Sequence, residues 1–197
     1  MKAGWLVLAG IVAAQAAAGA AAKSPADWVE PRSGTVASRW FFFNSACRPF
    51  GMVNLSPDTR TGGDWMNGYL YGDSSIRGFS HIHGWQLYGI SAMPFTGEPK
   101  GHLGADAYQS EFSHDDEVAR AGYHKVVLKT YGVTAELTST CRVGFHRYTF
   151  PAAAEAGVLL DTGAVLMDRI ARSEVRRVGD TELEGLAVMA ATTRRPK

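Results

Sequence analysis

The sequence has little net charge. Its 20 lysine and arginine residues nearly balance 19 aspartate and glutamate residues, leaving a formal charge of +1 at pH 7. Proteins that bind nucleic acids or anionic membranes through electrostatics carry a concentrated basic face. The one basic cluster here, Arg194, Arg195 and Lys197, stands at the extreme end of the sequence, and we interpret it as a solvated loop. We expect neither nucleic acid nor a membrane as a partner.

The sequence also lacks a hydrophobic run long enough to span a membrane, which takes roughly 20 consecutive apolar residues. Its best apolar stretch, residues 5–18, follows the single charge of Lys2 and precedes the small residues at 20–22. That order is typical of a secretory signal peptide. We predict a signal peptide over residues 1–22, one domain over residues 23–197, and a secreted or periplasmic location.

Cysteine is scarce, and several catalytic motifs are missing. Cys47 and Cys141 allow one disulfide in an oxidising compartment, but a buried thiol is an equal alternative for Cys47, which lies in an apolar stretch. The sequence has no Gly-x-Ser-x-Gly elbow, no P-loop and no Gly-x-Gly-x-x-Gly after a predicted strand. Nothing in it therefore indicates the hydrolase, NTPase or dinucleotide-binding classes that use these motifs.

What the sequence does contain is the alternation of antiparallel strands. Residues 124–130 and 133–140 flank the turn Tyr131-Gly132, and alternate residues of the second run are apolar. Because alternate residues in a strand share one face, this pattern predicts a half-buried antiparallel strand. Apolar and aromatic runs between turn residues predict further strands at 35–43, 50–55, 90–95, 141–150 and 158–161, and a hairpin around Gly179-Asp180.

Glycines are dense between residues 61 and 89, which disfavours a long helix and predicts ordered loops that cross a sheet. Many short strands and no convincing helix predict an all-β fold, an antiparallel β-sandwich. The sequence ends directly after a predicted strand, which would leave a sheet edge unpaired. We therefore expect the sandwich to be truncated at its C-terminus.

Two histidines are the first candidates for chemistry. His81 and His83 are two residues apart, so on a strand both imidazoles could reach one metal ion. No glutamate follows at the spacing of the His-x-His metal sites in cupins, because Gln86 and Leu87 occupy those positions. The alternative, which we favour, is a pair of histidines bonded to loop backbone or to a polar ligand.

Carboxylates and aromatic residues of the same region suggest carbohydrate chemistry. Glycoside hydrolysis needs two carboxyl groups facing one another, but Asp58 and Asp73 stand in turn-like contexts, and the acidic run at 115–117 is typical of a solvated loop. Sugar rings stack on flat aromatic side chains while their hydroxyls bind polar groups. Trp85, beside Gln86 and the two histidines, offers both chemistries, although core packing is an equal interpretation of the tryptophan.

Several ordered blocks of this sequence resemble the N-terminal domain of glycoside hydrolase family 92, the calcium-dependent exo-acting α-mannosidases. The blocks are residues 48–59 (RPFGMVNLSPDT), 76–83 (IRGFSHIH), 93–97 (MPFTG), 112–119 (FSHDDEVA), 131–138 (YGVTAELT) and 142–151 (RVGFHRYTFP). The resemblance implies a galactose mutarotase-like sandwich joined to an (α/α)6 catalytic barrel, which is absent from this sequence. It places the catalytic carboxyl groups and the calcium ligands in that barrel, so we expect no catalytic residue and no metal ligand here.

The resemblance also implies that this domain lends a wall to the sugar pocket of a secreted enzyme that trims mannose from glycans. The expected partners are a mannose-containing glycan and the C-terminal catalytic domain of the same polypeptide. The predicted substrate-binding residues are Phe50, Asp58, His81, His83, Trp85 and Gln86. Two alternatives stay open: a free-standing carbohydrate-binding module, and a small metal-dependent sugar epimerase built on His81 and His83.

Overall fold

The computed structural model describes residues 22–36, 45–61, 68–83, 88–152, 155–163 and 170–190. Within these ranges no helix is both long enough and apolar enough to cross a membrane. The predicted signal peptide falls almost wholly outside them and stays a prediction. The described residues form antiparallel strands joined by short helical turns, as the sequence pattern predicted.

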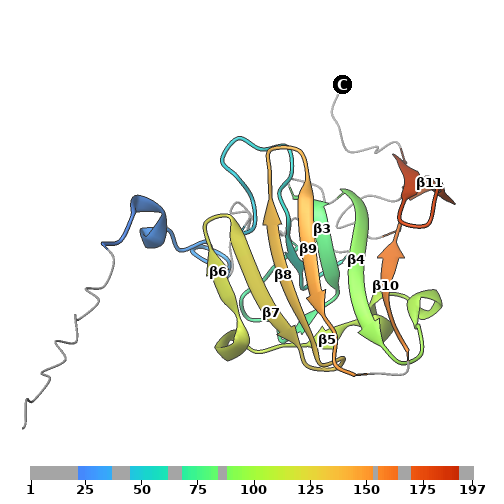
Figure 1. Cartoon of the computed structure of the whole chain (residues 1–197), viewed down its shortest axis with the longest axis horizontal. Coiled ribbons are helices and arrows are strands. Elements are labelled where there is room, and N and C mark those ends of the chain that lie inside the picture. The colour runs from blue at the N-terminus through green and yellow to red at the C-terminus, as the bar shows by residue number, and fades with distance from the viewer. Residues whose placement is uncertain are drawn as a thin grey trace, which may run out of the picture.

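Two four-stranded sheets make up the body of the molecule. One has the order β1 (Ser56–Asp58), β3 (Gly78–Ile82), β4 (Tyr88–Thr96) and β10 (Ala156–Asp161). The other has the order β6 (Val118–Arg120), β7 (Tyr123–Leu128), β8 (Val133–Ser139) and β9 (Gly144–Thr149). Figure 1 shows the second sheet lying across the first, with β8 and β9 in front of β3. The fold is therefore a β-sandwich.

The core lies between the two sheets and follows from their alternation. In β7 and β8 every second side chain is buried, and the β8 set includes Val133, Ala135 and Leu137. Phe79 of β3 and Met93 of β4 supply the opposing apolar surface. The β7–β8 hairpin confirms the strand pair predicted at 124–130 and 133–140; its turn contains Gly132 at φ 65°, a conformation that favours glycine.

Smaller elements complete the described chain. Two two-stranded pairs are β2 (Ser75–Ile76) with β5 (Ser110–Glu111), and β11 (Ile170–Arg177) with β12 (Leu183–Met189). The second pair is the hairpin predicted around Gly179-Asp180. The helical turns are η1 (Pro25–Trp28), η2 (Gly101–Leu103), α1 (Ala105–Tyr108) and η3 (His114–Asp116).

The strand predicted at 50–55 was wrong in position. Phe50 has φ 60° in a turn, and the first strand, β1, begins only at Ser56. Pro57 lies within β1, which is an edge strand, the place where a sheet tolerates proline. Of the strand predicted at 35–43, residues 35 and 36 form a turn and the rest fall outside the described ranges.

The two cysteines are thiols in this structure, and no disulfide joins them. Cys141 is exposed, whereas Cys47 is half-buried. Burial raises the pKa of the Cys47 thiol above its usual value. Of the two alternatives that the sequence left open for Cys47, a disulfide or a thiol, the structure contains the thiol.

Candidate functional site

Asp58 and His83 form a buried ion pair behind the end of β3. Asp58 Oδ1 lies 2.8 Å from His83 Nε2, and both side chains are 0% exposed. The other ring nitrogen, Nδ1, is 2.5 Å from the carbonyl oxygen of Asn54. Both ring nitrogens of His83 therefore face oxygen atoms in the interior. Asp58 is thus the buried end of a strand, and its interpretation as a turn former was wrong.

The chain packs closely around this pair. A Cβ atom on Gly68 would stand 1.9 Å from Asp58 Oδ1, so no larger residue fits there without displacing the carboxylate. Ser80 Oγ lies 3.3 Å from His83 Nε2, and Asn54 Nδ2 donates to the carbonyl oxygen of His83. Segments 54–58, 68 and 80–83 are therefore held together by polar contacts in the interior. These contacts fix where the chain leaves β3.

His81 has a different partner, although it stands only two residues from His83. Its Nε2 atom lies 2.6 Å from Nε2 of His146 on β9, whose Nδ1 bonds the hydroxyl of Tyr148 at 2.8 Å. Burial is the main cause that lowers the pKa of both histidines, and the pKa of His146 falls to about 4. The second cause is a neighbouring histidine, His83 for His81 and His81 for His146. This pair is therefore neutral at pH 7 and spans the two sheets.

The two histidines of the His-x-His segment do not converge on one point. His83 bonds Asp58 and His81 bonds His146. In the part of the chain that the structure describes, no group of three or more His, Cys, Asp or Glu residues is arranged to hold a metal ion. We therefore assign no step to a metal ion among the described residues.

The remaining predicted site residues divide into two groups. Phe50 is fully exposed, its aromatic ring standing out from a turn near the surface. Trp85 and Gln86 lie outside the described residues. The substrate-binding role of all six predicted residues stays a prediction. What the structure adds is that Asp58 and His83 are buried, whereas Phe50 is accessible.

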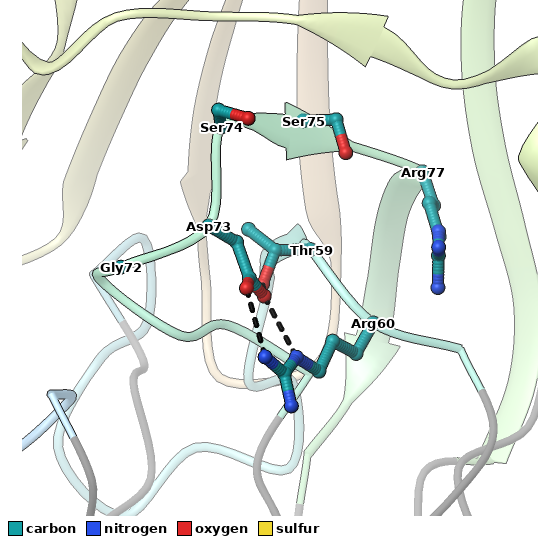
Figure 2. A pocket seen from close by; sticks show the side chains of 7 residues that line it. All are labelled: Thr59, Arg60, Gly72, Asp73, Ser74, Ser75 and Arg77. Atoms are coloured by element: carbon teal, nitrogen blue, oxygen red, sulfur yellow. Dashed lines mark hydrogen bonds and ion pairs between the residues drawn. The ribbon is translucent and has the colours of Figure 1, made fainter.

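A polar pocket opens beside this segment, where β1 ends and β2 begins. Its volume is about 420 Å³, and its lining residues are Thr59, Arg60, Gly72, Asp73, Ser74, Ser75 and Arg77. Arg60 holds the Asp73 carboxylate with two bonds of 2.9 Å (Figure 2). Burial opposes ionisation of Asp73, but the bonds from Arg60 and Thr59 outweigh it and lower the pKa of this carboxyl. Asp73 is therefore an ionised structural carboxylate.

Sequence reasoning missed a second buried polar cluster. Glu117, assigned to a solvated acidic run, has a side chain that is 0% exposed, so that interpretation was wrong. Tyr69 donates its hydroxyl to Glu117 at 3.0 Å, and His114 Nδ1 lies 2.7 Å from the same carboxylate. His124, also buried, lies 3.5 Å from it. The strand alternation could have predicted that His124 is buried, because His124 falls on the inward face of β7 with Val126 and Leu128.

His114 also ties this cluster to the chain that leads into the polar pocket. Its Nε2 atom donates to the carbonyl oxygen of Tyr71 at 2.8 Å. The two rings are stacked, with centroids 4.0 Å apart and planes within 4°. Through these contacts of His114, η3 holds in place the segment that carries Gly72 and Asp73.

Comparison with known proteins settles the family. The model for the glycosyl hydrolase family 92 N-terminal domain matches residues 28–195. The chain belongs to glycosyl hydrolase family 92. A family GH92 α-mannosidase from Bacteroides thetaiotaomicron is 32% identical, with a TM-score of 0.78 over 86% of this chain and 24% of that chain. Its complex with mannoimidazole is also 32% identical, with a TM-score of 0.75 over 83% of this chain and 23% of that one.

More distant members of family 92 share the fold. A family GH92 inverting mannosidase from the same organism is 23% identical, with a TM-score of 0.66 over 87% of this chain. No match was found among curated protein sequences. The chain spans about a quarter of each solved relative, 23% to 24% of their lengths. It therefore corresponds to the N-terminal domain of these enzymes.

Proposed function

We propose that this chain is the N-terminal domain of a secreted glycoside hydrolase that removes mannose from glycans. The observation that carries the proposal is the match over residues 28–195 together with the 32% identity to an α-mannosidase. In this proposal the domain forms one wall of the sugar pocket and is inert alone. The catalytic carboxyl groups and the calcium site belong to a C-terminal domain of the same polypeptide.

Three of the described carboxylates are engaged in contacts within the fold, in keeping with inertness of the isolated domain. Asp58 is buried against His83, and Asp73 is held by Arg60. Asp161 accepts a bond of 2.5 Å from the hydroxyl of Tyr108. A glycosidase needs one carboxyl group free to transfer a proton and a second that faces the sugar or a water. These three groups are instead engaged in holding the fold.

Exposed apolar side chains on the C-terminal strands support a docking surface for the rest of the polypeptide. Val158 and Leu160 on β10 are exposed, as are Leu186 and Val188 on one face of β12. Apolar residues concentrated on one part of a surface typically mark an interaction site. We assign this part of the domain to contact with the catalytic domain.

The pocket-wall role rests on residues near the end of β3. Among the predicted residues that the structure describes, Phe50 is fully exposed, and His81, Trp85 and Gln86 complete the proposed wall. Asp58 and His83 act indirectly, because their buried ion pair holds the segment from which the wall extends. An aromatic ring beside polar groups suits a sugar, whose ring stacks on the aromatic face while its hydroxyls bind the polar groups.

The test compares this 197-residue chain with the whole polypeptide on aryl α-mannosides and mannose-containing glycans. We expect hydrolysis by the whole polypeptide, lost on calcium chelation, and none by the chain alone. Hydrolysis by the chain alone would overturn the proposal that catalysis belongs to the C-terminal domain. A whole polypeptide that releases no mannose would overturn the substrate.

The wall itself is tested by Phe50→Ala in the whole polypeptide. We expect a raised KM with the fold intact, because Phe50 packs against nothing that its loss would expose. The matched control is Phe145→Ala, another exposed phenylalanine, on β9. Equal kinetics for the two variants would remove Phe50 from the wall.

A further inference from the structure

The polar pocket between β1 and β2 is built from groups that donate hydrogen bonds. Its walls carry two guanidinium groups, Arg60 and Arg77, and the hydroxyls of Ser74 and Ser75. Figure 2 shows the Arg60–Asp73 pair on one side of the pocket and the Arg77 side chain on the other. Each guanidinium offers five N–H donors in a planar fork and no acceptor. The single carboxylate among the lining residues is Asp73, so the lining bears a net positive charge.

The one carboxylate of the lining is already saturated. Its Oδ1 atom accepts from Arg60 Nη2 at 2.9 Å, and its Oδ2 atom accepts from Arg60 Nε at 2.9 Å and from Thr59 Oγ1 at 2.8 Å. Asp73 therefore has little capacity left to accept a bond from a ligand. Arg60 binds Asp73 through Nε and Nη2 only, which leaves its Nη1 hydrogens to donate to a ligand.

Arg77 has donor capacity to spare as well. One of its terminal nitrogens lies 2.6 Å from Asp106 Oδ1, a carboxylate that is 82% exposed. Its Nε atom is buried and has no hydrogen-bond partner among the residues that the structure describes. A buried N–H without a partner costs free energy, and a ligand acceptor would recover it after a small shift of the Arg77 side chain. This orphaned donor lies on the side chain that forms one wall.

The walls are fixed before any ligand binds. Thr59 Oγ1 accepts from the backbone N–H of Leu70, and Ser75 donates its hydroxyl to Gln109 Oε1 at 2.8 Å. The carbonyl oxygen of Ser74 accepts from the N–H of Phe112 at 3.0 Å. A site whose side chains are already held loses less conformational entropy on binding.

We propose that this pocket binds the oxyanion of an acidic saccharide, a sugar phosphate or a uronic acid. A positive, donor-rich lining with a saturated carboxylate selects a ligand that supplies acceptors, and arginine forks match phosphate and carboxylate oxygens. A volume of about 420 Å³ accommodates a monosaccharide rather than the anion alone. The hydroxyl of Ser74 complements the hydroxyls of the ring, and the Ser75 oxygen, whose hydrogen is donated to Gln109, can accept from them. This binding does not depend on the proposed mannosidase role.

The experiment titrates the purified chain with mannose 6-phosphate, glucuronate and neutral mannose, followed by calorimetry or NMR. We expect at least one acidic sugar to bind about tenfold more tightly than mannose, because a charge-assisted bond is worth about that factor. The preferred acidic sugar then identifies phosphate or carboxylate as the natural oxyanion. Equal binding of mannose, or no binding of any of the three, would overturn the proposal.

Variants tie the binding to the pocket. Arg77→Gln should weaken the acidic sugar about tenfold, and Arg77→Lys, which keeps the charge but loses the fork, should fall between. The control is Arg147→Gln, because Arg147 is also paired with a carboxylate, Glu136, but on the outer surface of β8 and β9. Thermal melting confirms that each variant is folded. Unchanged affinity in both Arg77 variants, or equal loss in the Arg147 control, would refute the assignment.

Discussion

His81 and His83 stand two residues apart and are embedded in opposite electrostatic surroundings. His83 faces a carboxylate and a carbonyl oxygen, in a pair with no exposed side-chain surface. His81 faces a second imidazole, and burial lowers the pKa of both rings. One histidine thus lies against two buried oxygen atoms, whereas burial favours the neutral form of the other.

The surroundings of the two histidines differ because different strands supply their partners. Asp58 ends β1, which pairs with β3 within the same sheet, whereas His146 lies on β9 of the opposite sheet. The pairing of β3 with β4 is also irregular between Ser80 and Ile82, where its register shifts. The same residue type, repeated at strand spacing, therefore serves one contact within a sheet and one between sheets.

The largest expected effect comes from removing the charge that faces His83. Asp58→Asn should destabilise the chain by about 2 to 3 kcal/mol, since it weakens a fully buried polar contact of 2.8 Å with His83 Nε2. Urea unfolding at pH 7 measures the loss. A change below about 1 kcal/mol would show that His83 does not depend on this carboxylate, and the contrast between the two histidines would disappear.

The neutral pair should make stability depend on pH. Because the pKa of His146 is lowered from 6.5 to about 4 in the folded chain, the unfolded chain binds the proton first as the pH falls. The free energy of unfolding should therefore decrease from pH 6.5 to pH 4, by roughly 1 to 3 kcal/mol from this residue. Unfolding followed across this window measures the slope, and His146→Gln, which does not titrate, should flatten it. Identical slopes would contradict a neutral His146.

The smallest effect is expected at the third contact of His83. Ser80→Ala removes a hydroxyl that is 3.3 Å from Nε2, a long hydrogen bond beside a much stronger partner. We expect a loss of about 1 kcal/mol or less in urea unfolding. A loss as large as that of Asp58→Asn would mean that the hydroxyl, rather than the carboxylate, dominates the surroundings of His83.

Strand alternation made much of the fold predictable. The inward residues of β7 and β8 follow a strict two-residue period, and the structure has those strands and their turn where the sequence placed them. β3 was not predicted, because its few residues lie among glycines and its burial depends on sheets formed by distant segments. The strand at 50–55 failed because Phe50 adopts a turn conformation that its apolar character does not reveal.

The candidate site was less predictable than the fold, for a physical reason. Sequence spacing showed that His81 and His83 were close, but their partners, His146 and Asp58, are 65 and 25 residues away. Asp73 likewise gained its role from Arg60, 13 residues earlier. The family resemblance suggested which segment to consider, whereas the pairing of its polar groups required the three-dimensional structure.

The contact between Tyr71 and His114 has a consequence for how this domain can vary among its relatives. The two residues are 43 positions apart, yet they hold the segment that carries Asp73 in place. A substitution at either position would shift one wall of the polar pocket, so we expect the two to change together. Within family 92, ligand preference at this pocket would then be altered most readily by paired substitutions at residues that never touch the ligand.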